Sequence, residues 1–275
     1  MCSRNPLTGI LIGTDPECFI INKKTNKVKS SVKLIPGTKE FPHHIDELGP
    51  GFALQTDNIL AEFNVPPTNN LETWVENIEK MKDYIRSFVQ NINENYDILC
   101  AASQNVPKSE LRSKQAKEFG CDPDFNIYTG DVNPKPENAA TTTLRSAGFH
   151  VHVGYDQCNV DRSIRLLGYL DAYLGIPSII IDKDSQRRSL YGKAGCFRLT
   201  DYGCEYRTLS SYFMKDRKHL EWVFRQTVKA IKAYNECKRI PRGELTQMVI
   251  NTNNIETAKE LCEDYNLCDD FLEED

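Results

Sequence analysis

The chain has little of several features that would assign it to a familiar class. No apolar run approaches the roughly 20 residues needed to cross a bilayer, and residues 1–6 contain no hydrophobic signal-peptide segment. Basic residues do not outnumber acidic ones, and the formal charge of −5 argues against a protein that works by covering nucleic-acid phosphates. We therefore expect a cytoplasmic protein with no membrane attachment.

The ten cysteines contain no C-x-x-C pair, which excludes the usual zinc-ribbon and thioredoxin motifs. They are scattered through 275 residues without a secretory segment, so we expect reduced thiols. Cys18, Cys196 and Cys204 stand in apolar, strand-like runs, where cysteine behaves as a small hydrophobe. With 40% hydrophobic residues, the chain can bury a sizeable core, and we expect one domain over residues 1–275.

Local patterns predict that strands come first in the chain and that helices follow. Asn70 can cap a long amphipathic helix that runs to Ile92, because apolar residues recur there at spacings of three and four. Residues 103–143 are polar and lack periodicity, which predicts a functional loop or lid beside an active site. The other expected strands are 10–21, a partner ending near Ile35, 52–55, 60–65, 195–199 and 203–209; the other expected helices are 161–174, 176–181, 222–234 and 257–265, before an acidic tail at 269–275.

His150 and His152 are the most informative pair, because the chain has only five histidines. In a strand, side chains alternate, so both imidazoles point to one face while Phe149, Val151 and Val153 point to the other. Two adjacent imidazoles on one face suggest a functional site. The alternative is a pair of structural histidines whose nitrogens are satisfied by backbone carbonyls.

Carboxylates repeat this one-sided pattern in other strand-like segments. Asp15 and Glu17 share a face if extended, Glu62 stands in an apolar run, and Glu205 is followed two residues later by Arg207. Several carboxylate oxygens with an occasional imidazole suit Mg²⁺ or Mn²⁺ holding phosphate better than they suit zinc. Each acid also has a structural alternative to metal binding: Asp15 can cap a turn before Pro16, and the glutamates can form cross-strand ion pairs.

A glycine-bracketed turn at residues 191–195 carries several cations. Its residues Tyr191 and Lys193 lie among Arg187, Arg188 and Arg198, which could clamp phosphoryl or carboxylate groups. A basic surface loop is the alternative interpretation.

The order of these motifs resembles the glutamine synthetase and glutamate-cysteine ligase superfamily. The carrying segments are Gly-Thr-Asp-Pro-Glu at 13–17, Ala-Gly-Phe-His-Val-His-Val-Gly at 147–154 and Glu-Tyr-Arg-Thr-Leu-Ser-Ser at 205–211, and they are most similar to the phage-type COOH-NH2 ligase branch (type 2). The resemblance covers residues 10–211 and leaves a helical C-terminal part at 212–275. It implies an α+β fold in which helices back a curved, mostly antiparallel sheet, with the active site on its concave face.

The resemblance also implies roles for individual residues. Glu17 and Glu62 would bind the metal nearer the acceptor substrate, while Asp15, His150 and Glu205 would bind the metals on the ATP phosphates. His152 would lie against the nucleotide. Independently of the resemblance, the basic turn makes Arg187, Tyr191, Lys193 and Arg198 candidates for further nucleotide binding. Arg207, assisted by Arg188 and by Glu62, would serve the phosphoryl transfer. Where larger relatives carry a second glutamate near Glu62, this chain offers Asp57, and the number of metal ions stays open.

The implied reaction is ATP-dependent formation of an amide or peptide bond through an acyl phosphate, with Mg²⁺ or Mn²⁺. The expected partners are small-molecule or peptide carboxylates and amines, in the host cytoplasm if the chain is phage-encoded; nucleic acid is expected only as a modified-base substrate, and a homo-oligomer is compatible with exposed strand edges. Three alternatives stay open: a guanidine kinase-like phosphotransferase, a metal-dependent hydrolase, and a non-catalytic nucleotide-binding protein.

Overall fold

A large antiparallel sheet organises the chain in the computed structural model, which describes residues 6–117, 124–134 and 141–268. Its central strand order is β3-β2-β6-β1-β11-β13-β12-β9, with β5 and then β4 attached to β6, and β7 attached to β2. A small second sheet pairs β8 (Ser103–Asn105) with β10 (Leu144–Ser146). The strands of the large sheet are β1 (Leu11–Thr14), β2 (Glu17–Asn22), β3 (Lys27–Lys29), β4 (His43–His44), β5 (Ala53–Asp57), β6 (Leu60–Thr68), β7 (Tyr96–Leu99), β9 (Phe125–Asn126), β11 (Val151–Gly154), β12 (Cys196–Thr200) and β13 (Gly203–Tyr206).

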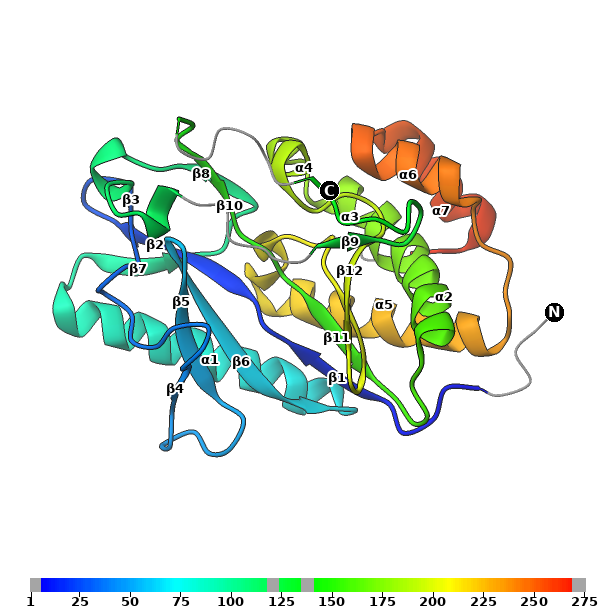
Figure 1. Ribbon diagram of the computed structural model, residues 1–275, viewed down its shortest axis with the longest axis horizontal. Coiled ribbons are helices and arrows are strands. Elements are labelled where there is room, and N and C mark those ends of the chain that lie inside the picture. The colour runs from blue at the N-terminus through cyan, green and yellow to red at the C-terminus, as the bar shows by residue number, and fades with distance from the viewer. Residues whose placement is uncertain (1–5, 118–123, 135–140, 269–275) are drawn as a thin grey trace.

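Helices cover one side of this sheet, and α1 and α5 pass behind the strands in Figure 1. The side chain of Asn70 caps α1 by accepting a hydrogen bond from the Thr73 N–H at 2.9 Å, as the sequence predicts. The α-helices are α1 (Leu71–Ile92), α2 (Val160–Leu170), α3 (Ile176–Ile181), α4 (Gln186–Leu190), α5 (Arg217–Asn235), α6 (Gly243–Thr252) and α7 (Ile255–Tyr265). The expectation of an α+β protein with a mostly antiparallel sheet is therefore confirmed.

The core between sheet and helices decides which side chains reach the other face. Phe149, Val151 and Val153 are fully buried, and the Phe149 ring meets Trp74 of α1 edge-on at 6.0 Å. Burying each such side chain is worth roughly 1.5–3 kcal/mol, so a one-residue slip of this strand is strongly disfavoured. The same alternation sends His150 and His152 away from the helices.

Several local predictions need correction. The strand after the first hairpin ends at Lys29 rather than near Ile35. β6 continues through Pro66-Pro67 to Thr68, because the prolines lie where its register with β1 shifts, and prolines are tolerated at such bulges. The range 103–143 is not structureless: its described parts contain β8, β9 and 3-10 turns at Lys108–Glu110 and Gln115–Lys117. No expected strand or helix corresponds to β4, β7, β10, α4 or α6, and the acidic tail expected at 269–275 lies outside the described residues.

The structure also bears on two expectations for the whole chain, which concern membrane spans and the state of the cysteines. The run Val160–Ile181 is continuous, because a π-helical turn at Asp171–Gly175 joins α2 to α3. By length and composition alone it could span a membrane, but 72% of its apolar 18-residue window is buried inside the protein, as in a core helix. Cys237 is disulfide-bonded, whereas Cys18, Cys196 and Cys204 are buried free thiols whose pKa burial raises.

Candidate active site

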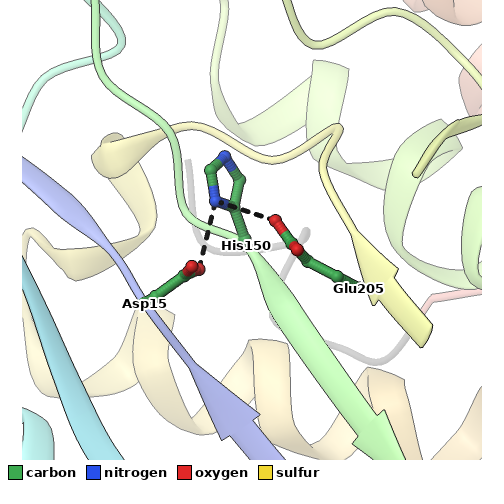
Figure 2. Close-up of side chains that lie close together, drawn as sticks. All are labelled: Asp15, His150 and Glu205. Carbon is green, nitrogen blue, oxygen red and sulfur yellow. Dashed lines mark hydrogen bonds and ion pairs between the residues drawn. The ribbon is translucent and has the colours of Figure 1, made fainter. Parts of the chain in front are cut away.

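Three neighbouring strands bring Asp15, His150 and Glu205 together on the face opposite the core (Figure 2). β11 lies between β1 and β13 in the sheet. Asp15 directly follows β1, His150 directly precedes β11 and Glu205 lies on β13, so the three residues meet although they are far apart in the chain. Nδ1 of His150 lies 3.1 Å from Oδ1 of Asp15 and 3.4 Å from Oε1 of Glu205. All three residues are buried, and the candidate ligand atoms lie within 4.8 Å of one another.

Gly148 is required for this arrangement. A β-carbon at Gly148 would lie 2.6 Å from Nε2 of His150, a contact that no real side chain makes. The glycine two residues before His150 is therefore a packing requirement of the imidazole. The Thr14 hydroxyl adds a 2.6 Å hydrogen bond to the His150 carbonyl and holds the start of β11 against β1.

His152 joins the same group through Asp15. Its Nε2 lies 3.0 Å from Oδ1 of Asp15, while its Nδ1 lies 2.8 Å from the Tyr202 hydroxyl. Burial raises the pKa of Asp15, but the imidazoles of His152 and His150 outweigh that effect and hold it well below its usual range. Burial lowers the pKa of His152, and the Asp15 carboxylate more than reverses this, so the net shift is upward.

A second cluster consists of Glu17, Asp57 and Glu62, again with ligand atoms within 4.8 Å. Glu17 on β2 is paired directly opposite Glu62 on β6, and Oε2 of Glu17 accepts a 2.5 Å hydrogen bond from the Gly148 N–H. Burial, reinforced by Asp15, Asp57 and Glu17, raises the pKa of Glu62 well above its usual range. Burial and then Glu17 raise the pKa of Asp57 to about 7.

These oxygens suit a hard divalent cation. Oε2 of Glu62 is buried without a hydrogen-bond partner among the described residues, and like charges opposed across strands repel one another. Carboxylate oxygens, with an imidazole in the first cluster, are the ligands that Mg²⁺ and Mn²⁺ accept. Both clusters therefore fit the metals that the sequence predicts.

A narrow cavity of about 30 Å³, lined by His150 of the first cluster and by Glu17 and Asp57 of the second, connects both clusters to basic side chains. Arg207 donates to Glu205, and its Nε lies 3.4 Å from Oδ1 of Asp124. Arg187 donates to the Leu209 carbonyl at 3.0 Å. The lining residues that carry charge or a hydroxyl are Glu17, Asp57, Asp124, Arg145, Ser146, His150, Arg187, Tyr191 and Arg207.

The predicted arginine clamp is divided. Arg187 faces the cavity, but Arg188, its helical neighbour on α4, points elsewhere and donates to Oδ1 of Asn253 at 3.1 Å. Arg198 pairs across β12 and β13 with Glu205, at 3.2 Å from Oε2. Lys193 lines a smaller neighbouring cavity that shares Asp124 and Tyr191 with the first. Arg188 thus points away from Arg187, because consecutive helical residues diverge by about 100°.

Sequence reasoning missed Asp124, Arg145 and Tyr202. Asp124 lies in the aperiodic region 103–143 and Arg145 lies just beyond it, where no pattern indicates the direction of a side chain. Tyr202 stands in the turn between β12 and β13, and its ring stacks on His152 with centroids 6.1 Å apart. A second cavity of about 360 Å³ begins at this pair, and its other lining residues are Leu11, Gly13, Thr14, Asn64, Val65, Pro67 and Gly154.

Comparison with known proteins agrees with the motifs. Residues 141–253 match the model of the family described as Phage phiEco32-like COOH.NH2 ligase-type 2, a range that contains the histidine strand and the Glu-x-Arg strand but not Asp15 or Glu17. The match confirms the resemblance to this family that the sequence motifs indicate. No curated protein matches the chain.

Among solved structures, a bifunctional glutathione synthetase from Pasteurella multocida aligns with 93% of this chain at 11% sequence identity and a TM-score of 0.43. The chain covers 46% of the length of that protein.

Proposed function

We propose that this protein is an ATP-dependent ligase that joins a carboxylate to an amine through an acyl phosphate. One observation carries the proposal: residues from two candidate metal-binding clusters and the arginine Arg207 line a single cavity. We propose further that the chain forms one glutamine synthetase-like domain, with this cavity on the concave face of its sheet.

In this proposal, each of the two clusters holds a different divalent cation. Asp15, His150 and Glu205 would hold the cation on the ATP phosphates, and Glu17, Asp57 and Glu62 would hold the one nearer the acceptor. Bound Mg²⁺, or Mn²⁺, would neutralise phosphate oxygens and polarise the group under attack. Without a cation, the carboxylates of the second cluster repel one another, and this repulsion supports a metal site there.

The nucleotide base fits the cavity beyond His152. Its walls are mainly apolar, and the half-exposed Tyr202 ring offers a flat surface for a purine. From there the triphosphate would run past His152 and Arg198 toward Arg207. Arg187, Tyr191 and Lys193 would contact phosphate oxygens on the far side, and Arg188 would support α4 from behind.

The reaction needs activation because a carboxylate is an anion with a poor leaving group. A carboxylate oxygen attacks the γ-phosphorus, the bond to ADP breaks, and an acyl phosphate forms. The amine then attacks the carbonyl carbon, phosphate leaves, and the amine loses a proton. Arg207 would stabilise the charge that develops on the phosphoryl group. Glu62, whose pKa is raised, would lie beside the acceptor substrate.

The substrates are proposed as small-molecule or peptide carboxylates and amines in the cytoplasm. An assay of ADP release with Mg²⁺ across a panel of amino acids, amines and short peptides, followed by mass spectrometry, tests the proposal. Amide product with ADP and phosphate supports it. A phosphorylated guanidine, turnover without nucleotide, or ATP binding without ADP would instead identify a guanidine kinase, a hydrolase or a nucleotide-binding protein.

A further inference from the structure

A buried carboxylate behind the sheet, Asp171, links two segments of the cavity wall. It is fully buried and begins the π-helical turn Asp171–Gly175, a local structure that often marks functional positions. The Tyr128 hydroxyl donates to its Oδ2 and the Tyr206 hydroxyl donates to its Oδ1, each at 2.8 Å. Both oxygens of one carboxylate are thus used by tyrosines from different parts of the chain.

Each tyrosine belongs to a segment that supplies one member of the Asp124–Arg207 ion pair. Tyr206 immediately precedes Arg207, and strand alternation sends Tyr206 toward the helices and Arg207 into the cavity. Tyr128 lies four residues after Asp124, just beyond β9. Asp171 therefore stands behind the ion pair and is connected to both of its sides.

The Tyr128 ring occupies a slot made by two glycines. A β-carbon at Gly195 or Gly243 would lie 2.7 Å or 2.8 Å from the ring. Within the same segment, the Asn133 amide donates to Oδ2 of Asp124 at 3.1 Å, and Asn126 accepts from the Tyr128 N–H at 2.9 Å. The position of Asp124 thus depends on where Tyr128 is anchored.

We infer that Asp171 is a positioning residue. Through Tyr128 and Tyr206 it holds Asp124 and Arg207 in place relative to each other. The inference rests on the proposed function, in which Arg207 stabilises the transferred phosphoryl group. Glu205 and Asp124 hold the Arg207 guanidinium from two sides, so a shift of the 124–134 segment would turn its donors away from the phosphate. Donors aimed at a developing charge lose much of their effect when misplaced by about 1 Å.

The first test compares Tyr128→Phe with Tyr169→Phe. Both variants lose one tyrosine hydroxyl, but that of Tyr169 on α2 donates to the Lys238 carbonyl, away from both cavities. We expect Tyr128→Phe to lower kcat about tenfold with the KM for ATP unchanged, and Tyr169→Phe to lower neither. Equal behaviour of the two variants would overturn the inference.

A double-mutant cycle separates positioning from a general loss of stability. If Tyr128 acts through Asp124, adding Tyr128→Phe to Asp124→Asn should cost little more than Asp124→Asn alone. Multiplicative losses would show that the two residues act independently and would refute the inference.

Amide hydrogen exchange tests the anchor without substrates. The Asn126 N–H bonds to the Asp131 carbonyl and the Ile127 N–H bonds to the Gly195 carbonyl, so both should exchange faster in Tyr128→Phe than in Tyr169→Phe. Wild-type protein that never consumes ATP would refute the proposed function. Faster exchange would then still support the anchor, and unchanged exchange would overturn it.

Discussion

Glu17 and Glu62 lie directly opposite each other on β2 and β6, both buried, so two carboxylates share one rung of an antiparallel ladder. Like charges in this position destabilise a sheet, and the raised pKa of Glu62 reflects burial together with its acidic neighbours. A divalent cation between them would turn this repulsion into a binding site. The cluster is thus understandable as a metal site that the strand register creates.

Replacing Glu17 by Gln tests this site directly. Turnover should be abolished, by more than the roughly 10–100-fold that loss of a ligand's supporting partner costs, because a ligand of the acceptor-side metal is removed. The melting temperature in chelator should rise, because the amide can still accept from Gly148 while repulsion toward Glu62 falls. The exposed Glu94→Gln should change neither quantity, and normal turnover of Glu17→Gln would remove Glu17 from the site.

The stability of the metal-free protein should depend on pH through Asp57. Its pKa is raised from 3.8 to about 7 in the folded state, so its contribution is complete at acid pH and is lost as pH rises through that interval. We expect the melting temperature in chelator to fall between about pH 4 and 7, and the fall to be smaller in Asp57→Asn. Mg²⁺ should also reduce the fall.

The control for this experiment is Asp264→Asn on the surface of α7, which should keep the wild-type profile. His152 contributes with the same sign, because its raised pKa makes its stabilisation disappear as pH rises. The difference between wild type and Asp57→Asn therefore isolates Asp57. An identical pH profile for these two proteins would contradict the assignment.

Tyr202→Ala should weaken nucleotide binding while leaving the chemistry largely intact. Stacking of a base on an aromatic ring is worth about 1–3 kcal/mol, so we expect the KM for ATP to rise about tenfold with a small change in kcat. Tyr202→Phe keeps the ring and should retain most of the affinity. Steady-state kinetics with ATP as the varied substrate would decide, and unchanged KM in Tyr202→Ala would place the base elsewhere.

Arg207→Lys should keep the charge but lose the planar set of donors that reaches Glu205, Asp124 and the phosphoryl group. We expect kcat to fall about 100-fold with a modest effect on the KM for ATP. Arg86→Lys changes a surface ion pair with Asp97 and serves as the control. A fall in ATP affinity with unchanged kcat would give Arg207 a binding role instead of a role in phosphoryl transfer.

Much of the framework follows from local sequence. Alternation in residues 149–153 places both imidazoles opposite the core, and the Asn70 cap defines the start of α1. The short motifs around Asp15, His150 and Glu205 indicate the ligase family that the match over residues 141–253 supports. These features depend on contacts between residues that are close in the chain, so they can be predicted from the sequence.

The sequence by itself therefore determined which side chains leave the core and which chemistry they can perform. Only the tertiary structure decided their grouping: Glu17 with Asp57 and Glu62, Asp15 with His150 and Glu205, Asp124 against Arg207, and Arg188 away from Arg187. The physical reason is that strand register and the path of aperiodic loops depend on packing between segments far apart in the chain, such as those of Asp15 and Glu205, which are 190 residues apart. Local periodicity predicts the face of a residue but not its partner.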